Sequence, residues 1–223
     1  MEFDKTIQLI QKAYSELGHQ MGYRFLLSSK NTFSSDVLFL NLNPGGSTIH
    51  PEHPTDSYET GPAHLTESWG NGLAVGMSPL QIQVQKLFEE LSKKIPCNRN
   101  LIHESLIAYF IPFRSPRMND LHEKDKSIKF AIELWSEIIS TMKPKLIICL
   151  GDDVFKNVKK LFPVVSAQFS TKLGWGEITA DVYKYENDCR IIKLPHLSTF
   201  KIFSRKECEP YIDKLLTEAT KDW

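Results

Sequence analysis

The sequence has few cysteines, no long apolar run and no excess of charge of either sign. None of the cysteines is close enough to another to form a Cys-x-x-Cys pair, which excludes zinc-ribbon and iron–sulfur spacings for Cys97, Cys149, Cys189 and Cys208. We expect reduced thiols, with Cys149 as a small core residue of an apolar strand. The longest apolar runs, such as residues 146–150, are far shorter than the roughly 20 residues of a membrane-spanning helix.

The charge balance and the first residues narrow the class of protein further. The chain begins MEFDKTIQLI, which lacks the basic and apolar order of a signal peptide, so we expect a cytoplasmic protein without membrane contact. The 27 basic residues equal the 27 acidic ones, which argues against binding nucleic acid by bulk electrostatics, because such domains are usually clearly basic. A local basic patch is still compatible with this balance, because four cations lie within fourteen residues: Lys193, Lys201, Arg205 and Lys206.

Apolar strands alternate with amphipathic helices along the chain. Continuous apolar runs predict strands over residues 36–42, 105–111, 145–150 and 189–194, with a hairpin or strand pair over 175–185. Helical spacing predicts helices over residues 3–17, 79–94, 125–142 and 152–162, and a last one from about 204 or 206. The pattern predicts one α/β domain over residues 1–223, with three α/β/α layers around a mostly parallel, four-stranded sheet.

Some helix boundaries can also be predicted. Ser78 is expected to cap the helix that Pro79 opens, and Pro144 to end the helix before it. Asp152 and Asp153 resemble a catalytic pair, but we expect them to cap the helix that begins there, because acidic residues favour helix N-termini.

Three polar loops follow predicted strands, and ligands of parallel sheets bind beyond the C-terminal strand ends. These loops are NPGGS after residue 42, PFRSPR after residue 111 and PHLSTF after residue 194. The Asn43 amide can hold a water by donating and accepting hydrogen bonds, while Pro44 fixes the backbone and Gly45 admits close approach of a ligand. A turn without any ligand is equally compatible with these residues taken alone.

His196 follows the strand over residues 189–194 by one proline, so it should lie at the same sheet edge. A neutral imidazole there can donate a hydrogen bond to developing negative charge, or act as general acid or base. A lone histidine at a strand end is more often structural, and the pairing with Asn43 is what favours chemistry.

Two further groups of residues have both a functional and a structural interpretation. His50, Glu52, His53 and His64 could form a metal site, but their spacing does not match four-coordinate zinc, and we expect neither metal nor other cofactor. Arg114 and Arg117 suit phosphate contacts in a strand-end loop, or are simply solvated surface charges.

Two of these loops resemble motifs of the uracil-DNA glycosylase superfamily. NLNPGG (residues 41–46) resembles the first motif, which in the mismatch-specific and single-strand-selective branches reads Gly-x-Asn-Pro-Gly. PHLS (residues 195–198) resembles the second motif, His-Pro-Ser or its relatives, and LIICLGDDVFKNV is similar to the strand–Gly–helix segment between them. The order and spacing agree over roughly residues 36–206.

The resemblance implies roles for individual residues. Asn43 matches the position that positions or activates the hydrolytic water, and His196 the position that stabilises the departing base as an anion. Ser198 matches a residue near the DNA backbone. An aromatic residue stacks on the extruded base in this family, so Tyr58 or Trp69 is expected to do so, or else to anchor its loop. The remaining expected contacts are Leu42, Pro44, Gly45 and Tyr109 with the substrate, and Arg114, Arg117, Lys201 and Arg205 with DNA.

The chain also departs from the family pattern. Asn41 stands where the first motif usually has Gly, Leu197 where the second usually has Pro, and Tyr109 where related branches carry an Asn that reads uracil. Pocket hydrogen bonds decide base identity strongly, so these departures leave the base open. No cysteine precedes Cys97, so the iron–sulfur cluster of some branches is not expected.

The leading hypothesis is a monomeric, monofunctional DNA glycosylase that excises a flipped-out uracil, deaminated or modified base. The alternative is a non-catalytic relative with this fold that binds DNA or a protein partner, which the motif departures and the neutral charge favour. A third hypothesis is a hydrolase of small nucleosides or nucleotides. Activity on a free nucleotide but not on a DNA strand would select the third.

Overall fold

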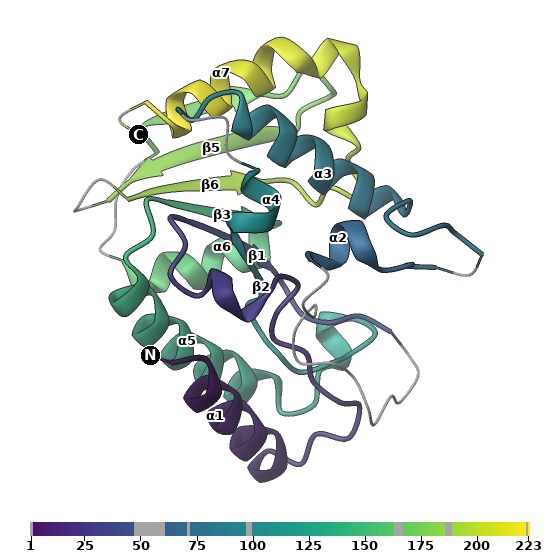
Figure 1. Ribbon diagram of the computed structural model, residues 1–223, viewed down its shortest axis with the longest axis vertical. Coiled ribbons are helices and arrows are strands. Elements are labelled where there is room, and N and C mark those ends of the chain that lie inside the picture. Colours follow the sequence, from purple (N-terminus) through teal and green to yellow (C-terminus); the bar gives the residue numbers. More distant parts are fainter. Residues whose placement is uncertain are drawn as a thin grey trace.

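The computed structural model describes residues 2–46, 61–70, 72–96, 100–162, 167–185, 189–221 and 223. In this part of the chain, helices lie on both faces of a central six-stranded sheet with the strand order β2-β1-β3-β6-β5-β4 (Figure 1). The first four strands in that order are parallel, and β5 and β4 are antiparallel additions. The strands are β1 (Val37–Asn41), β2 (Leu106–Tyr109), β3 (Leu146–Leu150), β4 (Phe169–Lys172), β5 (Thr179–Lys184) and β6 (Arg190–Leu194).

The α/β class predicted from the sequence is confirmed, but the sheet is larger than the four strands expected. The four apolar runs form the parallel part, whereas the hairpin expected over residues 175–185 already begins at Phe169 and adds two strands. Strand β4 alternates between half-buried and exposed residues at the edge of the sheet. It therefore lacks the continuous apolar signal of the central strands.

Each face of the sheet has its own core. Side chains of β1 alternate between the two, with Val37 and Phe39 on one side and Leu38 and Leu40 on the other. The α3–α7 core is covered by α2 (Ala63–Thr66), α3 (Pro79–Ser92), α4 (Leu101–Glu104) and α7 (Glu209–Ala219). The α1–α5 core is covered by α1 (Phe3–Glu16), α5 (Lys124–Met142) and α6 (Asp152–Val158).

Most of the predicted helix boundaries are confirmed. Ser78 and Gln81 form a reciprocal capping box at the start of α3, and α5 ends at Met142. The capping role expected of Asp152 and Asp153 is wrong, because Gly151 is the N-cap of α6 and both acids lie in its first turn. The acids still complement the helix dipole there. Cys149 is fully buried, as predicted.

A segment before β1 closes one edge of the sheet. Leu26 forms an antiparallel bridge with Ala108 of β2, and the Leu27 N–H donates to the Ile107 carbonyl at 2.7 Å. Covering β2 in this way removes an exposed strand edge that would otherwise pair with other chains.

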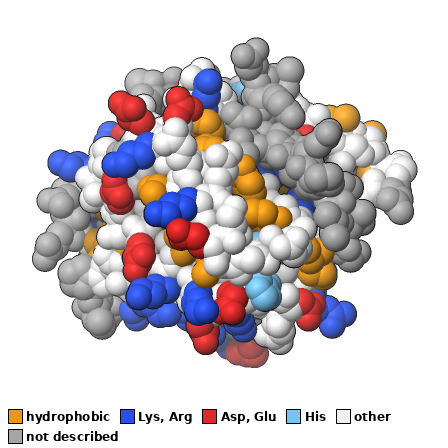
Figure 2. All heavy atoms as spheres, turned by 90° about the horizontal axis from the view of Figure 1, so that it is seen from below, with side chains coloured by type: hydrophobic (Ala, Val, Ile, Leu, Met, Phe, Trp, Pro, Cys, Tyr) orange, Lys and Arg blue, Asp and Glu red, His pale blue; other side chains and the backbone are white. Residues whose placement is uncertain are grey.

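The face of the molecule shown in Figure 2 carries both acidic and basic side chains. Seen from below, acidic and basic side chains are interspersed (Figure 2), and α1 contacts α5 through the exposed Lys5–Glu137 pair at 3.8 Å. No helix among the described residues has both the length and the apolar character needed to cross a membrane.

Candidate functional site

The four parallel strands point the same way, so their carboxyl ends lie together along one side of the sheet. The loops that follow these strands meet there. Asn43 follows β1, Arg114 and Ser115 follow β2, Gly151 follows β3, and His196 follows β6. Because β3 separates β1 from β6, Asn43 and His196 follow strands that lie on either side of β3, roughly 10 Å or two strand spacings apart. Gly151 has φ 91°, a conformation suited to glycine, and brings no side chain between them.

The Asn43 amide is held in one orientation by two backbone carbonyls, which can only accept, and by the Ser115 hydroxyl. Its Nδ2 donates to the carbonyls of Pro44 at 3.1 Å and Ser115 at 3.3 Å, and to Ser115 Oγ at 3.0 Å. A carbonyl cannot donate, so the NH2 group must face these partners and Oδ1 must face away from them. Within the described chain nothing donates to Oδ1, which leaves it able to accept from a water.

The loops after β1 and β2 are joined by further hydrogen bonds. The Ser115 N–H donates to the Pro44 carbonyl at 3.1 Å, and the buried Ser115 hydroxyl donates to the Arg117 carbonyl at 2.9 Å. Arg114 Nη1 donates to the Gly45 carbonyl. Gly46 has φ 109°, a conformation that L side chains rarely adopt, so this position favours glycine. The Asn-Pro-Gly-Gly turn is thus joined to the loop after β2 by several hydrogen bonds.

His196 lies beside Gly151, and a Cβ at Gly151 would be 3.9 Å from its Cδ2. Its Nδ1 is 2.8 Å from Ser198 Oγ, and among the described residues Nε2 has no hydrogen-bond partner. His196 is exposed, but burial of part of its ring lowers its pKa below the ordinary 6.5, which favours the neutral imidazole. If Ser198 donates to Nδ1, the ring proton is on Nε2, which can then donate to a ligand.

The other residues expected to contact substrate lie in different surroundings. Tyr109 packs against the α3–α7 core, whereas Leu42 packs against the α1–α5 core on the opposite side of the sheet. Pro44 is buried and Gly45 is exposed. Tyr58 lies outside the described residues. The substrate contacts of the others stay predictions.

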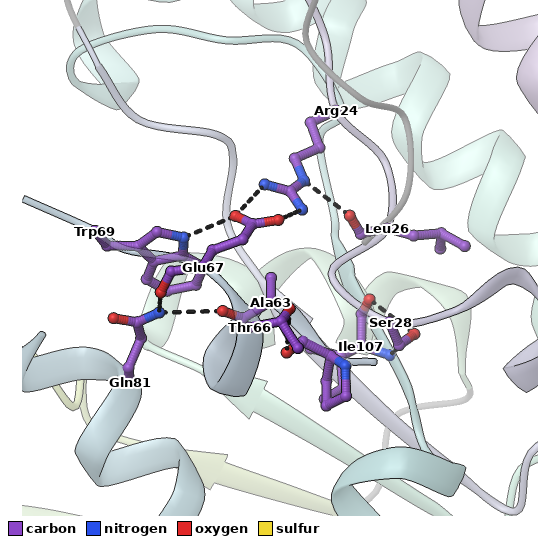
Figure 3. A network of polar contacts seen from close by, with 10 residues as sticks. Arg24, Leu26, Ser28, Ala63, Thr66, Glu67, Trp69, Gln81 and Ile107 are labelled. Carbon is purple, nitrogen blue, oxygen red and sulfur yellow. Dashed lines mark hydrogen bonds and ion pairs between the residues drawn. The ribbon is translucent and has the colours of Figure 1, made fainter. Parts of the chain in front are cut away.

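Trp69 belongs to a network of polar contacts that sequence reasoning missed (Figure 3). Its Nε1 donates to Glu67 at 2.9 Å, and its ring meets the buried His64 edge-on at 4.9 Å. Glu67 forms a bidentate ion pair with the buried Arg24 at 2.8 and 2.5 Å, and Gln81 donates to the Glu67 carbonyl at 2.7 Å. These contacts suit the loop-anchor alternative for Trp69. Arg24 and Glu67 are 43 positions apart and share no motif, so no sequence signal pairs them.

The cations expected to bind DNA differ in their exposure and in the contacts that they make within the chain. Arg114 is half-buried beneath the Gly45 carbonyl, and burial lowers the pKa of its guanidinium. Arg205 stacks on Trp175, with its guanidinium carbon 3.6 Å from the ring centroid, and pairs with Glu207 at 3.6 Å. Arg117 and Lys201 are exposed, and within the described chain neither forms an ion pair. These two remain available to phosphates.

Lys193, which also belongs to the basic patch, is engaged within the sheet. Its Nζ lies 2.7 Å from Asp181 and 3.6 Å from Asp152. Burial opposes its charge, but the hydrogen bond to Asp181 and the nearby acids outweigh this and raise the pKa of Lys193. The patch inferred from sequence spacing is therefore smaller than its four cations suggest.

Two further features of the described residues bear on the expected metal site and on cavities. No group of three or more His, Cys, Asp or Glu in the described residues could hold a metal; His50, Glu52 and His53 lie outside them. His64 is fully buried, and neither ring nitrogen has a hydrogen-bond partner. A polar cavity of about 520 Å³ lies at the opposite end of β1, against Asp36 and Val37, far from the converging loops.

No family model matches this chain, and no curated protein matches it either. The functional assignment accordingly depends on the two motif loops and on the geometry of the sheet edge.

Proposed function

We propose that the protein is a monofunctional DNA glycosylase with a uracil-DNA glycosylase-like fold. It hydrolyses the N-glycosidic bond of a flipped-out uracil, deaminated or modified base. One observation carries the proposal: the Asn43 amide oxygen and the His196 Nε2, neither with a hydrogen-bond partner among the described residues, follow the strands on either side of β3. The parallel order β2-β1-β3-β6 between two helical layers supports the finer fold assignment.

Asn43 positions the attacking water. Its Oδ1 can accept one water hydrogen, and the bonds from Nδ2 to Pro44 and Ser115 keep the oxygen in place. The amide cannot remove a proton at neutral pH, so its contribution is orientation. Correct orientation of a nucleophile can account for a large part of the rate enhancement of an enzyme.

His196 stabilises the departing base. The bond from C1′ to the base nitrogen breaks with its electron pair going to the base, the water oxygen bonds to C1′, and the water's proton passes to solvent. The sugar develops oxocarbenium-like charge and the base becomes an anion, which takes up a proton after release. A neutral Nε2–H, oriented by Ser198, donates to this anion; removing such a donor typically costs about 100-fold or more in rate.

The expected substrate is a nucleotide that leaves the base stack, because a base inside a duplex cannot reach the sheet edge. Arg117 and Lys201 are the exposed cations best suited to hold the flanking phosphates. A second candidate, hydrolysis of free nucleosides or nucleotides, is favoured by the internal pairing of Lys193 and Arg205, which weakens the basic patch.

A base-release assay on labelled oligonucleotides tests the proposal. The panel contains uracil, hypoxanthine, xanthine, thymine mismatches and 5-modified pyrimidines, each in single and double strands. Asn43→Ala and His196→Ala serve as site variants, and Lys5→Ala on the far α1–α5 side serves as the matched surface control. We expect abasic sites with the native protein and the control, and at least about 100-fold fewer with both site variants.

The other outcomes separate the alternatives. Release from nucleosides but not from oligonucleotides supports the second candidate. Oligonucleotide binding without release on any substrate supports a non-catalytic DNA-binding protein. Neither release nor binding would refute both DNA-based hypotheses.

A further inference from the structure

A loop of apolar residues projects from the molecule between α2 and α3. Figure 1 shows this loop extending away from the sheet and its helices. Four large apolar side chains of the described chain are exposed, and three of them lie within five residues of this loop: Leu73 (42% exposed), Val75 (53%) and Met77 (53%). Single exposed apolar residues are ordinary on a protein surface, whereas a cluster is typical of an interaction surface. Residues 72–77 are termed the apolar tip.

Hydrogen bonds hold the backbone of the apolar tip, so the fold fixes where these side chains are presented. The Met77 N–H donates to the Ala74 carbonyl at 3.2 Å, across a turn whose third residue, Gly76, has φ 74°. The Gly76 N–H donates to the Glu67 carbonyl at 3.0 Å, and the Gly76 carbonyl accepts from Gln85 Nε2 of α3 at 2.7 Å. A loop that is already ordered loses less entropy when it binds a partner.

A groove lies beside the apolar tip, between α3 and α4. It has a volume of about 490 Å³, and Leu65, Phe88 and Ile102 supply its apolar lining. Gln85 also lines this groove, while its amide holds the Gly76 carbonyl of the tip. A protrusion and a hollow are therefore neighbours on one surface of the chain.

The composition of the tip indicates what it contacts. Residues 68–78 contain no Lys, Arg, Asp or Glu. Nucleic acids and anionic membranes are bound mainly through Lys and Arg side chains, which the tip lacks. An apolar protein surface suits the tip, and the groove supplies one on every copy of this chain. The formal net charge is zero, so two copies do not repel each other.

The size of the surface favours pairing two tips with two grooves. A stable protein interface takes about 20–30 residues from each side, far more than the tip alone offers. In a two-fold dimer, each side contributes both its tip and the nine residues that line its groove. This total approaches the lower limit of a stable interface, so the expected association is weak and reversible.

We propose that two copies of the chain form a two-fold dimer in which the apolar tip of each copy fills the groove between α3 and α4 of the other. Both subunits use the same patch, as the symmetry of such a dimer requires. The dimer replaces the monomer expected from the sequence. The inference does not depend on the proposed glycosylase function.

Sedimentation equilibrium tests the association. The mean mass of the native protein should rise from 25.6 kDa toward twice that value between about 1 and 300 μM. The double variant Leu73→Ser/Val75→Ser removes much of the apolar surface of the tip and should stay monomeric. Tyr211→Ser is the matched control, because it removes the fourth exposed apolar side chain, which lies on α7, and it should associate like the native protein. A native protein that stays at the monomer mass throughout overturns the inference.

Two further variants test whether the tip contacts the groove. Ser92 and Asn100 line the groove from α3 and from the start of α4, and Ser92→Trp and Asn100→Trp each fill it while leaving the tip intact. Either substitution should weaken the dimer at least about tenfold, because overfilling a packed contact is costly. Thermal unfolding shows which variants are folded, and Asn100 is exposed, where substitutions change stability little. Native association in a folded Asn100→Trp variant would overturn the pairing of tip and groove.

The salt dependence distinguishes an apolar contact from association by charge. Raising NaCl from about 0.1 to 1 M shortens the screening length from about 10 to 3 Å and should not weaken the dimer. A dimer that dissociates in high salt would be held by ion pairs, and the inference would be wrong. None of these measurements uses a substrate, so the proposed glycosylase function stands or falls separately.

Discussion

The polar side chains of the Arg24–Glu67 network and those at the end of β1 differ in how many hydrogen bonds they make. In the network, Glu67 accepts from both guanidinium nitrogens of Arg24 and from Trp69 (Figure 3). At the end of β1, the Asn41 amide makes one long hydrogen bond, and Asn43 Oδ1 receives none from the described residues.

The number of hydrogen bonds that a polar side chain makes within the chain indicates whether it serves the fold or a ligand. Buried polar groups that satisfy one another hold segments of the chain together, and their loss is felt as lost stability. Polar groups that are oriented but unsatisfied at a strand end are available to a ligand, and their loss should be felt as lost activity. Substitutions in the network should therefore lower stability, and substitutions at the end of β1 should lower activity.

The largest effect is expected from breaking the ion pair of the network. In Glu67→Gln, the Arg24 side chain, only 8% exposed, loses the bidentate carboxylate of Glu67, which should cost about 3 kcal/mol of unfolding free energy. The matched control is Glu137→Gln in the exposed Lys5 pair, which should cost less than about 1 kcal/mol. Urea unfolding measures both. Similar losses of unfolding free energy in the two variants would mean that the Arg24–Glu67 ion pair stabilises the protein no more than an exposed ion pair does.

Acid should destabilise the protein through His64, which packs between Phe39 and Trp69. Burial, followed by Arg24, lowers the pKa of His64 from 6.5 to about 3. Folding therefore favours the neutral ring, so its stabilising effect is complete above about pH 6.5 and is lost as the pH falls toward 3. At pH 5 the loss is about 2 kcal/mol.

His64→Phe isolates this acid effect, because it keeps an aromatic ring and removes the titrating nitrogens. The drop in unfolding free energy between pH 7 and pH 5 should shrink by about 2 kcal/mol in this variant. Part of the drop should persist, since burial also lowers the pKa of His19 to about 4. An unchanged pH dependence would contradict a neutral, buried His64.

A smaller effect is expected from Ser115→Ala, which alters the support of Asn43. The variant removes the hydroxyl that accepts from Nδ2 at 3.0 Å, but the carbonyls of Ser115 and Pro44 still hold the amide. We expect a loss of about 1 kcal/mol in stability and less than about tenfold in base release. Ser198→Ala is the comparison, because it should instead change the pH profile through His196. A loss in Ser115→Ala as large as that in Asn43→Ala would show that the carbonyls do not suffice.

The smallest effect is expected from the exposed cation Lys201. Lys201→Ala should weaken oligonucleotide binding a few-fold and lower the slope of log affinity against log salt by about 1. Lys5→Ala, on the α1–α5 side, should change neither quantity. Fluorescence anisotropy over a salt series measures both variants. An unchanged slope in Lys201→Ala would remove Lys201 from the DNA contact surface.

The sequence predicts those elements whose structure depends on neighbouring residues in the chain. Residues 37–42 are apolar except for Asn41 and lead into Asn-Pro-Gly-Gly, so both β1 and its polar end could be predicted. Strand β4 could not, because Phe169–Lys172 gains its strand structure from pairing with β5. The four residues of α2 are likewise too few for a helical period to be visible.

The two candidate catalytic residues could be predicted from the sequence, but the residues that hold them in place could not. Asn43 and His196 follow strands and sit in motifs, whereas the Asn43 amide is fixed by Ser115, 72 residues away in the sequence. This contact cannot be predicted without the fold.

The most direct test of the central claim compares two measurements on Asn43→Ala. Asn43 should matter to chemistry far more than to the fold. We therefore expect single-turnover base release to fall at least about 100-fold, while the thermal unfolding midpoint falls by no more than about 4 °C, as the loss of about 1 kcal/mol implies for a chain of this size. A native rate of base release with a much lower midpoint would show that the polar end of β1 serves the fold, and would contradict the account.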